Sequence, residues 1–415
     1  MNVKITPSSL YGSVAAPSSK SYAHRLIIAA ALSGGKTEIK LNGLSRDIKA
    51  TVAAVRALGA KVTEFSEGLS VCGISEIPES AVIDCDESGS SLRFLLPVSA
   101  ALGVKTEFSG AERLMQRPIT ALTDCMNEHG KTADGYRTTG KLKRGDYVLN
   151  ASDSSQYITG MLFALCVIGG GTLTITGKEV SRGYVEVTAD VLRLFGAEIE
   201  REGNVFVVKR GFDSANRRVE AEGDWSNAAF FLAAGAIGGE VSVRGLKKDS
   251  HQGDAAIADV LKKFGADVRF YGDTVTVKKD SLCGITADLE NIPDLAQIIA
   301  VTAAFANGKT VLTSANRLKL KESDRIYAII STLAEAGIKA EYSEECGGSI
   351  TVYGGKPHGG TFDGGRDHRT VMSAAVLALN AQGNSAIIGA EAADKSYPAF
   401  FGDITTLGGK AYVEF

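Results

Sequence analysis

The stretch Gly171-Thr172-Leu173-Thr174-Ile175 sets the architecture, because versions of it recur along the whole chain of 415 residues. Each copy is a glycine followed by alternating polar and apolar residues, the pattern of a strand with one buried face. The copies begin at Gly35, Gly103, Gly171, Gly239, Gly308 and Gly383. Their glycines lie 68, 68, 68, 69 and 75 residues apart. One structural repeat therefore occurs six times.

An apolar helix precedes each strand. These helices are predicted over residues 23–32, 92–102, 158–168, 228–237, 295–306 and 371–379. They are apolar nearly all round, so we expect them to be buried. Second, amphipathic helices that end at a glycine are predicted over residues 48–58, 185–195, 255–264 and 326–336. The pattern indicates an α/β fold with mixed sheets, divided three repeats and three near residues 222–224.

Polar residues gather where the buried helices are predicted to begin. Ser152, Asp224 and Ser226 are interpreted as helix caps. Capping does not explain Lys20, Arg25, Arg93, His368 and Arg369. A cation near a helix N-terminus opposes the helix dipole unless an anion lies between them. We therefore expect the six helix starts to converge on one site for a polyanion.

Composition and failed motifs exclude several functions. The net charge of −3 provides no basic field for nucleic acid. Six cysteines without a CxxC pair and five histidines without metal spacing argue against a zinc site and suit a reducing cytoplasm. ATP, NAD and hydrolase motifs are incomplete. The N-terminus lacks a signal-peptide pattern and the apolar runs are short for a bilayer. We expect a cytoplasmic protein that needs no metal or cofactor and binds neither membrane nor nucleic acid.

Specific motifs lie at the helix starts and in the loops. They are Pro17-Ser18-Ser19-Lys20-Ser21 with His24-Arg25, Ser88-Gly89-Ser90-Ser91-Leu92-Arg93, Arg117-Pro118, Ser154-Ser155-Gln156, Pro293-Asp294, Lys321-Glu322-Ser323-Asp324-Arg325, Asp367-His368-Arg369, and Lys395 before Ser396-Tyr397-Pro398. With them the whole chain resembles the EPSP synthase (3-phosphoshikimate 1-carboxyvinyltransferase) family of enolpyruvyl transferases.

The resemblance implies a two-lobed α/β fold of six βαβαββ repeats, three per lobe. Lobe 1 would comprise residues 1–17 plus 224–415, and lobe 2 residues 18–223, with the active site in the cleft between them. It also implies transfer of the carboxyvinyl group of phosphoenolpyruvate to the 5-hydroxyl of shikimate 3-phosphate, with loss of phosphate through a tetrahedral intermediate. This reaction belongs to aromatic amino acid biosynthesis. A monomer and, because Gly89 is retained, sensitivity to glyphosate are implied as well.

The resemblance also assigns residues. Shikimate 3-phosphate is expected to meet Lys20, Ser21, Arg25, Ser154, Ser155, Gln156, Ser181, Asp294 and Lys321. Phosphoenolpyruvate is expected to meet Lys20, Gly89, Arg117, Gln156, Arg325, Arg369 and Lys395. Asp294 is the candidate base for the hydroxyl proton, and Glu322 with Lys20 the candidate acid at C3. From local sequence alone, Asp294 also fits a helix cap, and Glu322 a surface ion pair with Lys321 or Arg325.

Three positions depart from the pattern: Glu87, Ser90 and Arg317. They affect expectations of affinity and not of reaction. The first alternative is a UDP-N-acetylglucosamine enolpyruvyl transferase, which usually carries a reactive cysteine in the loop that corresponds to residues 111–117; this loop has none. The second is a non-catalytic anion-binding repeat scaffold, which would need the cations but not Asp294 and Glu322. A related RNA-end cyclase is disfavoured by the acidic net charge.

Overall fold

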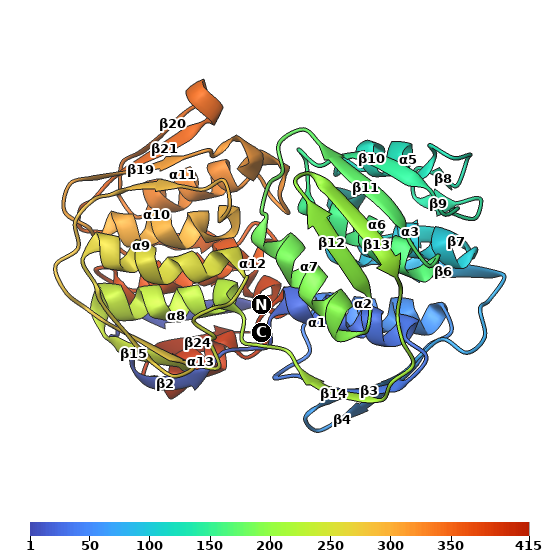
Figure 1. The fold of residues 1–415 in the computed structure, drawn as a ribbon. Helices are drawn as coiled ribbons and strands as arrows, with labels where there is room; N and C mark the ends of the chain where they lie inside the picture. The colour runs from blue at the N-terminus through green and yellow to red at the C-terminus, as the bar shows by residue number, and fades with distance from the viewer. Residues whose placement is uncertain (415) are drawn as a thin grey trace. The chain divides into compact units, whose positions relative to one another are not determined.

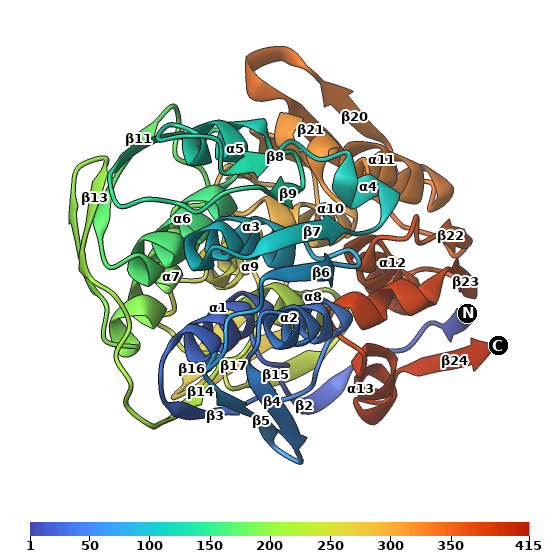
Figure 2. The same cartoon turned by 90° about the vertical axis from the view of Figure 1, so that its right-hand side faces the viewer.

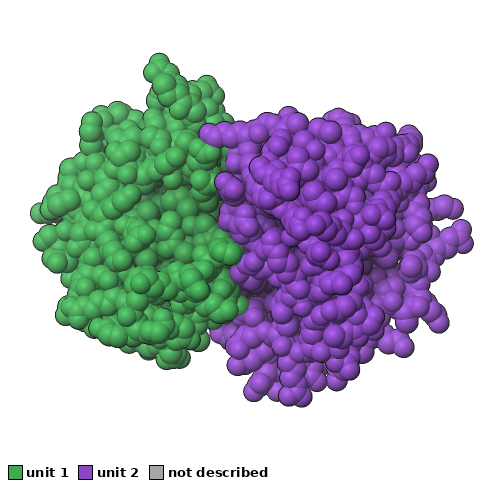
Figure 3. Space-filling view, in the orientation of Figure 1, with its two compact units in different colours: residues 1–17, 222–415 green, residues 18–221 purple. Residues whose placement is uncertain are grey.

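The computed structural model describes residues 1–414 and has two compact units. Unit 1 comprises Met1–Pro17 and Glu222–Phe415, and unit 2 comprises Ser18–Ala221 (Figure 3). The chain leaves unit 1 once, after Pro17, and returns to it after Ala221. The dividing positions lie within a few residues of the repeat boundary read from the sequence.

Unit 2 contains three four-stranded sheets and their helices. The sheets, in strand order, are β14 (Arg217–Glu220), β3 (Lys36–Lys40), β5 (Gly68–Cys72), β4 (Lys61–Phe65); β6 (Ser80–Asp84), β7 (Lys105–Ser109), β9 (Arg137–Thr138), β8 (Ala133–Asp134); and β10 (Asp146–Asn150), β11 (Gly171–Thr176), β13 (Val205–Arg210), β12 (Glu198–Glu202). The helices are α1 (Lys20–Leu32), α2 (Arg46–Ala57), α3 (Gly89–Leu102), α4 (Glu112–Met115), α5 (Thr120–Met126), α6 (Ser155–Val167) and α7 (Gly183–Leu194). Figure 2 shows β6 and β7 side by side.

Unit 1 is built in the same way (Figure 1). Its sheets, in strand order, are β16 (Asp267–Tyr271), β17 (Thr274–Lys278), β15 (Glu240–Arg244), β2 (Tyr11–Ala15); β18 (Thr286–Asp288), β19 (Lys309–Thr313), β21 (Ser349–Tyr353), β20 (Ala340–Ser343); and β22 (Thr361–Asp363), β23 (Ser385–Ile388), β1 (Asn2–Thr6), β24 (Lys410–Glu414). Its α-helices are α8 (Trp225–Gly238), α9 (Ile257–Phe264), α10 (Ala296–Ala304), α11 (Arg325–Glu335), α12 (His368–Asn380) and α13 (Phe400–Thr406). Its 3-10 helices are η1 (Gly253–Ala256), η2 (Pro293–Leu295), η3 (Asn316–Leu320), η4 (Glu345–Gly347) and η5 (Ala390–Lys395).

The recurring glycine-led segment forms the second strand from one edge of every sheet. β11, for example, pairs in parallel with β10 and antiparallel with β13. β3, β7, β15, β19 and β23 have the same two kinds of neighbour. A parallel pair needs a crossover, and in each repeat the buried helix supplies the crossover into this strand or lies directly before it. The predicted mixed sheets and six repeats are thereby confirmed.

The N-terminal segment belongs to unit 1 because both of its strands pair there. β1 lies between β23 and β24, antiparallel to both, and β2 lies parallel to β15. The two strands complete sheets whose other members lie more than 200 positions later in the chain. This pairing makes unit 1 discontinuous in sequence.

The helices rich in small residues form the core of each unit, as predicted. In unit 2, α3 and α6 pack closely because Gly160 faces the backbone of α3: a Cβ at Gly160 would lie 2.2 Å from the carbonyl oxygen of Arg93. In unit 1, α8 contacts α9, α10 and α12. Burial of these apolar helices stabilises each unit, and the polar first turns of the helices carry many of the candidate residues.

Two local expectations need correction. The helix predicted over residues 295–306 begins as the 3-10 turn η2, because Pro293 stands at its first position, and its α-helical part ends at Ala304. Asp224 caps α8 as predicted, but the cap of α6 is Ser154 and not Ser152, and Ser226 lies inside α8. Within residues 1–414, no helix combines the length and apolar character that crossing a membrane requires.

Candidate active site

In unit 1 the candidate residues gather around the carboxylate of Asp294 in η2. Its Oδ1 accepts from Arg325 Nη1 at 2.6 Å and from Lys321 Nζ at 3.2 Å. Its Oδ2 accepts from Arg369 Nη2 at 3.2 Å. Asp294 therefore receives three cations, two from residues 321–325 and one from the start of α12, and does not cap its helix, since no side-chain cap bond forms there.

Arg325 is buried and holds three carboxylates. Besides Asp294, its Nη2 donates to Glu322 Oε2 at 2.7 Å and its Nε to Asp367 Oδ2 at 2.9 Å. The guanidinium is 1% exposed. An arginine can bind three carboxylates at once because its donors form a rigid planar fork. Arg325 thus fixes the relative positions of η2, the 321–324 segment and the start of α12.

The local charges set the proton affinities of these groups. Burial alone would raise the pKa of Asp294, but Arg369, Lys321 and Arg325 hold it well below its ordinary value. Burial would also raise the pKa of Asp367, and Arg325 with His368 instead lowers it to about 2. Burial lowers the pKa of Lys321, against the attraction of Asp294. Asp294 is consequently ionised at neutral pH and, in this structure, a weak base.

Arg369, the second residue of α12, has donors to spare. Its Nη2 binds Asp294, whereas Nε and Nη1 are buried and have no hydrogen-bond partner within the described residues. A buried donor left unsatisfied costs about 1–3 kcal/mol. The arrangement is one that an incoming acceptor, such as a carboxylate or phosphate oxygen, would satisfy.

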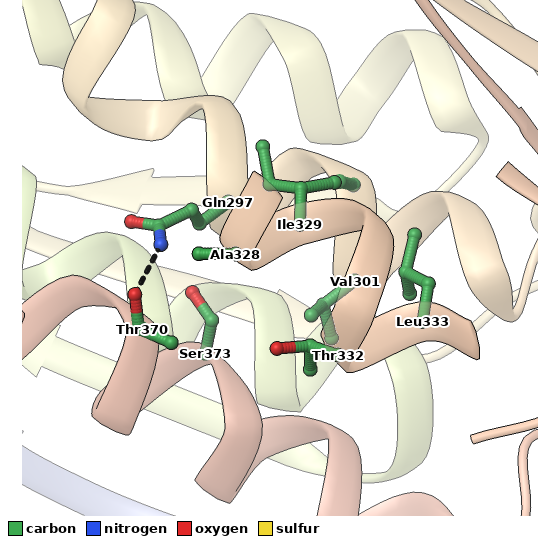
Figure 4. Close-up of a pocket in the computed structure, with 9 residues that line it drawn as sticks. Gln297, Val301, Ala328, Ile329, Thr332, Leu333, Thr370 and Ser373 are labelled. Atoms are coloured by element: carbon green, nitrogen blue, oxygen red, sulfur yellow. Dashed lines mark hydrogen bonds between the residues drawn. The ribbon is translucent and has the colours of Figure 1, made fainter. Parts of the chain in front are cut away.

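A second contact joins the starts of α10 and α12 (Figure 4). Gln297 Nε2 donates to Thr370 Oγ1 at 2.6 Å. Gln297 lies one turn after Asp294, and Thr370 follows Arg369. Beside this bond is a cavity of about 10 Å³, which Ile329 of α11 also lines; that is room for about one water molecule. The Gln297–Thr370 bond therefore links the two segments that carry Asp294 and Arg369.

Lys395 lies at the end of η5 and is 3% exposed. The next residue ties this segment to the start of α8, because Ser396 Oγ donates to Asn227 Oδ1 at 3.0 Å. Near the same helix start, Ser226 donates to the buried carboxylate of Asp254. Burial, and then Asp294, raises the pKa of Asp254 to about 6. The first turn of α8 thus carries hydrogen bonds to both segments.

In unit 2, Lys20 begins α1 and forms an ion pair with Asp47. Lys20 Nζ lies 2.7 Å from Asp47 Oδ2, and the Asp47 side chain is 5% exposed. Asp47 stands in the first turn of α2, after the N-cap Ser45. The carboxylate holds the ammonium group at the paired starts of α1 and α2. Ser21, the next residue, is partly exposed at the same end of α1.

Arg25 is 2% exposed and largely saturated by the protein itself. Nε donates to Thr188 Oγ1 at 2.8 Å, and Nη2 to Thr159 Oγ1 and to the Tyr184 carbonyl oxygen. Nη1 donates to the carbonyl oxygen of Ser21 at 2.7 Å. Burial lowers the pKa of Arg25 to about 10. Arg25 therefore joins α1 to α6 and α7, and only one of its N–H groups, on Nη1, is left for a ligand.

The starts of α3 and α6 are joined through Gln156. Its Oε1 accepts from Arg93 Nη1 at 2.8 Å, and its Nε2 donates to Ser90 Oγ at 3.0 Å. Ser154 caps α6 by accepting from the Gln156 backbone N–H at 3.2 Å. The amide orientation of Gln156 is thereby set, and the starts of α3 and α6 are linked by side-chain bonds.

Gly89, the first residue of α3, lies against Arg117. A Cβ at Gly89 would be 2.9 Å from Arg117 Nη1 and 3.6 Å from Arg93 Nη1. Arg117 Nε is buried without a hydrogen-bond partner in the part of the chain that the structure describes. The absence of a side chain at position 89 therefore lets two guanidinium groups approach the α3 start.

Ser155 and Ser181 are both mostly buried. Ser155 is the first residue of α6, and Ser181 lies just before α7 with φ at +53°. Positive φ is unfavourable for a residue with a side chain and recurs at ligand sites. Ser155 belongs to a quoted motif and Ser181 is assigned by the resemblance alone, and only the backbone shows the unusual conformation at Ser181.

Some participants were missing from the expected set. Asp47 resembles any acidic residue in a first helical turn, and Asp254 follows a glycine in an ordinary-looking loop. Asp367 belongs to a quoted motif, but the resemblance assigns it no role; in the structure it caps α12 and binds Arg325. No local sequence signal distinguishes Asp47 or Asp254, because their partners lie far away in the chain.

Comparison with known proteins agrees with the geometry. The model of the family described as EPSP synthase (3-phosphoshikimate 1-carboxyvinyltransferase) matches residues 5–404. A 3-phosphoshikimate 1-carboxyvinyltransferase of Clostridium novyi (strain NT) is 37% identical over 426 residues, 98% of each chain. One of Pyrococcus abyssi (strain GE5 / Orsay) is 38% identical over 399 residues, covering 95% of this chain and 94% of its own.

Solved structures are similar over the whole chain. EPSP synthase from Acinetobacter baumannii has a TM-score of 0.82 at 26% identity and covers 100% of both chains. The enolpyruvyl transferase NikO from Streptomyces tendae has a TM-score of 0.76 at 18% identity, covering 99% of this chain and 98% of its own. The second similarity concerns the fold alone.

Proposed function

The chain belongs to the EPSP synthase family and has 3-phosphoshikimate 1-carboxyvinyltransferase activity, and we propose that the charged clusters of its two units together carry out the reaction. The reaction transfers the carboxyvinyl group of phosphoenolpyruvate to the 5-hydroxyl of shikimate 3-phosphate and releases phosphate. Both substrates are small phosphorylated carboxylates, so their recognition requires several cations.

The observation that carries this assignment is the pair of arginines with buried, unsatisfied donors. Arg117 of unit 2 has one such donor at Nε and Arg369 of unit 1 has two, counting hydrogen bonds within residues 1–414 only. Because unsatisfied buried donors are costly, an anion that reaches them gains binding energy. We propose that phosphoenolpyruvate accepts from both arginines, that Lys20, Gln156, Arg325 and Lys395 also bind it, and that Gly89 leaves room for it.

We propose that shikimate 3-phosphate binds mainly to unit 2. Its phosphate would accept from the hydroxyls of Ser154 and Ser155 and from the backbone at the start of α6, a suitable place for an anion. The set is Lys20, Ser21, Arg25, Ser154, Ser155, Gln156 and Ser181 in unit 2, with Asp294 and Lys321 from unit 1. The bonds that already saturate most of Arg25 support a role in which it positions Ser21 and α1 and offers the ligand one N–H.

In the proposed addition step, Asp294 takes the proton of the 5-hydroxyl while the hydroxyl oxygen of shikimate 3-phosphate bonds to C2 of phosphoenolpyruvate. A proton goes to C3 from Glu322 or Lys20, giving a tetrahedral intermediate. In the elimination step the C2–O bond to phosphate breaks, and C3 returns a proton to the residue that supplied it, so that the carbon–carbon double bond forms again. The cations stabilise the departing phosphate. Atoms balance without a cofactor, because phosphoenolpyruvate supplies both the carbon unit and the leaving group.

The low pKa of Asp294 is consistent with this role once substrate charges are considered. Arg369, Lys321 and Arg325 hold the pKa down, and the first is a proposed ligand of phosphoenolpyruvate, the second of shikimate 3-phosphate. Anions that share these cations weaken their hold on Asp294, so its proton affinity rises when both substrates are bound. Substrate binding would thus strengthen the base.

We further propose a monomeric, cytoplasmic enzyme. One chain contains both sets of site residues, and its six cysteines are free thiols, as expected of a reducing compartment. Light scattering during gel filtration measures the oligomeric state; a dimer mass at micromolar protein would contradict the first part.

Phosphate release by the purified protein tests the function. We expect release with phosphoenolpyruvate plus shikimate 3-phosphate, and none when UDP-N-acetylglucosamine replaces the second substrate. Phosphate release with phosphoenolpyruvate and the UDP-sugar, but not with shikimate 3-phosphate, would contradict the assignment of shikimate 3-phosphate as the acceptor. Folded protein that binds shikimate 3-phosphate but releases no phosphate would contradict the roles of Asp294, Glu322 and Lys20.

A further inference from the structure

Unit 2 contains a chain of buried hydrogen bonds whose residues have none of the roles proposed above. His24 Nδ1 is 2.7 Å from Thr51 Oγ1, which is 2.6 Å from Ser91 Oγ, which donates to Ser88 Oγ at 2.8 Å. All four residues are fully buried, with 0% exposure. His24 belongs to α1, Thr51 to α2, and Ser91 and Ser88 to the first turn and N-cap of α3. The chain therefore joins three helices near the ends that carry Lys20, Asp47 and Gly89.

Which atoms donate and which accept in this chain of hydrogen bonds follows from the other ring nitrogen of His24, Nε2. His24 Nε2 is buried and has no hydrogen-bond partner among residues 1–414. A buried N–H without an acceptor is rarer in proteins than a buried acceptor without a donor. The proton of a neutral ring therefore belongs on Nδ1, and Nε2 keeps its lone pair.

The ring is neutral because of its surroundings. Burial lowers the pKa of His24 to about 3; Asp47 acts in the opposite direction, and Lys20 and Arg25 act in the same direction as burial. These are the charged groups that act on the ring from α1 and α2. With Nδ1–H as donor, the hydroxyl of Thr51 donates to Ser91, and that of Ser91 donates to Ser88.

We propose that His24 is a positioning residue that donates from Nδ1 into this chain and, through Thr51 and Ser91, orients Ser88 at the start of α3. Ser88 caps α3 by accepting from the Ser91 backbone N–H at 3.2 Å, and the following residue is Gly89, beside Arg117. The chain of hydrogen bonds thus fixes the position of the Gly89 segment relative to Lys20. The proposal rests on the proposed function, since it assigns to this segment the binding of phosphoenolpyruvate.

The effect on the two substrates differs. α1 stays anchored to α6 and α7 by Arg25 whether or not the chain is intact. Loss of the Thr51 hydroxyl removes the hydrogen bond between α2 and the first turn of α3 and leaves the Arg25 anchor in place. Binding of phosphoenolpyruvate is therefore affected more than binding of shikimate 3-phosphate.

Thr51 offers a matched pair of variants, because valine has the shape of threonine without its hydroxyl. Thr51→Val removes both hydrogen bonds of the hydroxyl, to His24 and to Ser91, and we expect it to raise the KM for phosphoenolpyruvate about tenfold. The KM for shikimate 3-phosphate should stay within about twofold, and Thr51→Ser should leave both KM values within about twofold of the parent protein. Equal rises in both KM values, or no rise, would overturn the proposal.

The tautomer of His24 is measured without any substrate. Two-bond ¹⁵N–¹H correlation spectra of the unmodified protein, with His24 assigned by its loss in His24→Gln, distinguish the two neutral forms. We expect protonation at Nδ1, unchanged from pH 8 to pH 5 because of the low pKa. A ring protonated at Nε2, or one that titrates in this range, would overturn the proposal even in an active enzyme. If His24 has the expected tautomer but the protein lacks the transferase activity, the chain of hydrogen bonds stands and only the proposed function is contradicted.

Discussion

Arg325 Nη1 lies 2.6 Å from Asp294 Oδ1, and the two side chains differ in exposure: Arg325 is 1% exposed and Asp294 is 26% exposed. The arginine therefore approaches the carboxylate from the protein interior. Because Arg325 also binds Glu322 and Asp367, its own orientation is fixed by two further ion pairs. Asp294 is thus held by a rigid buried cation while remaining accessible to a ligand, as a proposed general base should be.

Replacing Asp294 by asparagine tests this role. Asp294→Asn keeps the shape and one acceptor oxygen but removes the base, so we expect kcat to fall by about 10²–10⁴-fold. Binding of shikimate 3-phosphate, followed by calorimetry, should change far less. The control is Asp259→Asn, since Asp259 has an exposed side chain on α9. A kcat within a few fold of the parent enzyme would contradict the assignment of Asp294 as the base.

Adding a methyl group at Gly89 tests the close approach of Arg117. In Gly89→Ala the new Cβ would lie 2.9 Å from Arg117 Nη1, so the guanidinium has to move by a few tenths of an ångström. We expect the KM for phosphoenolpyruvate to rise by about tenfold or more, with a smaller change for shikimate 3-phosphate. Inhibition by glyphosate should weaken in parallel.

Gly402→Ala is the matched control for this substitution. A Cβ at Gly402 would meet no atom within 4 Å among the described residues, and the backbone there has no positive φ. Steady-state kinetics on both variants should show a change at position 89 alone. Equal KM values for phosphoenolpyruvate in Gly89→Ala and the parent enzyme would show that Arg117 does not need this space.

Arg25→Lys tests whether the hydrogen bonds of Arg25, and not only its positive charge, stabilise unit 2. Lysine keeps the positive charge but cannot reach Thr188, Thr159 and the Tyr184 carbonyl oxygen together. We expect unfolding of unit 2 to become easier by about 2–4 kcal/mol, since buried acceptors lose a charged donor. Hydrogen exchange of the amides of α1, α6 and α7 measures the loss. Arg137→Lys, in an exposed pair with Glu107, should change exchange by less than about 0.5 kcal/mol; equal effects of the two variants would refute the anchoring role of Arg25.

Asp254 gives a pH dependence whose sign can be worked out. Its pKa in the folded protein is about 6, above its ordinary 3.8, mainly because of burial. Between these values the folded chain binds a proton that the unfolded chain does not, so this group stabilises the fold as pH falls and costs stability at higher pH. Asp254→Asn removes the charge, so we expect the free energy of unfolding at pH 7.5 to rise by about 2–3 kcal/mol, and this rise to disappear near pH 4.

Trp225 reports on this region, because it is the single tryptophan of the chain and precedes Ser226, which donates to Asp254. Urea unfolding followed by its fluorescence at several pH values gives the comparison with the parent protein. A gain of the same size at pH 4 and pH 7.5, or a loss at pH 7.5, would contradict a raised pKa for Asp254.

The repeats could be predicted because their signal is local. A glycine and the alternating residues after it specify a strand, and a run of small apolar residues specifies a buried helix, wherever they occur. The same holds for the helix caps, although Ser152 and Ser154 both fit the cap of α6 and the sequence favoured the wrong one. Site residues were selected by their motifs, which retain residue types without showing how those residues meet.

Which residues meet was decided by the tertiary structure. Lys20 and Asp47 are 27 positions apart, Arg325 and Asp367 are 42 apart, and Arg25 and Thr188 are 163 apart. No spacing rule encodes such pairs, because they form only when separate helix starts are packed side by side. The low proton affinity of Asp294, the neutral ring of His24 and the unsatisfied donors of Arg369 arise from that packing, since burial and neighbouring charge set all three.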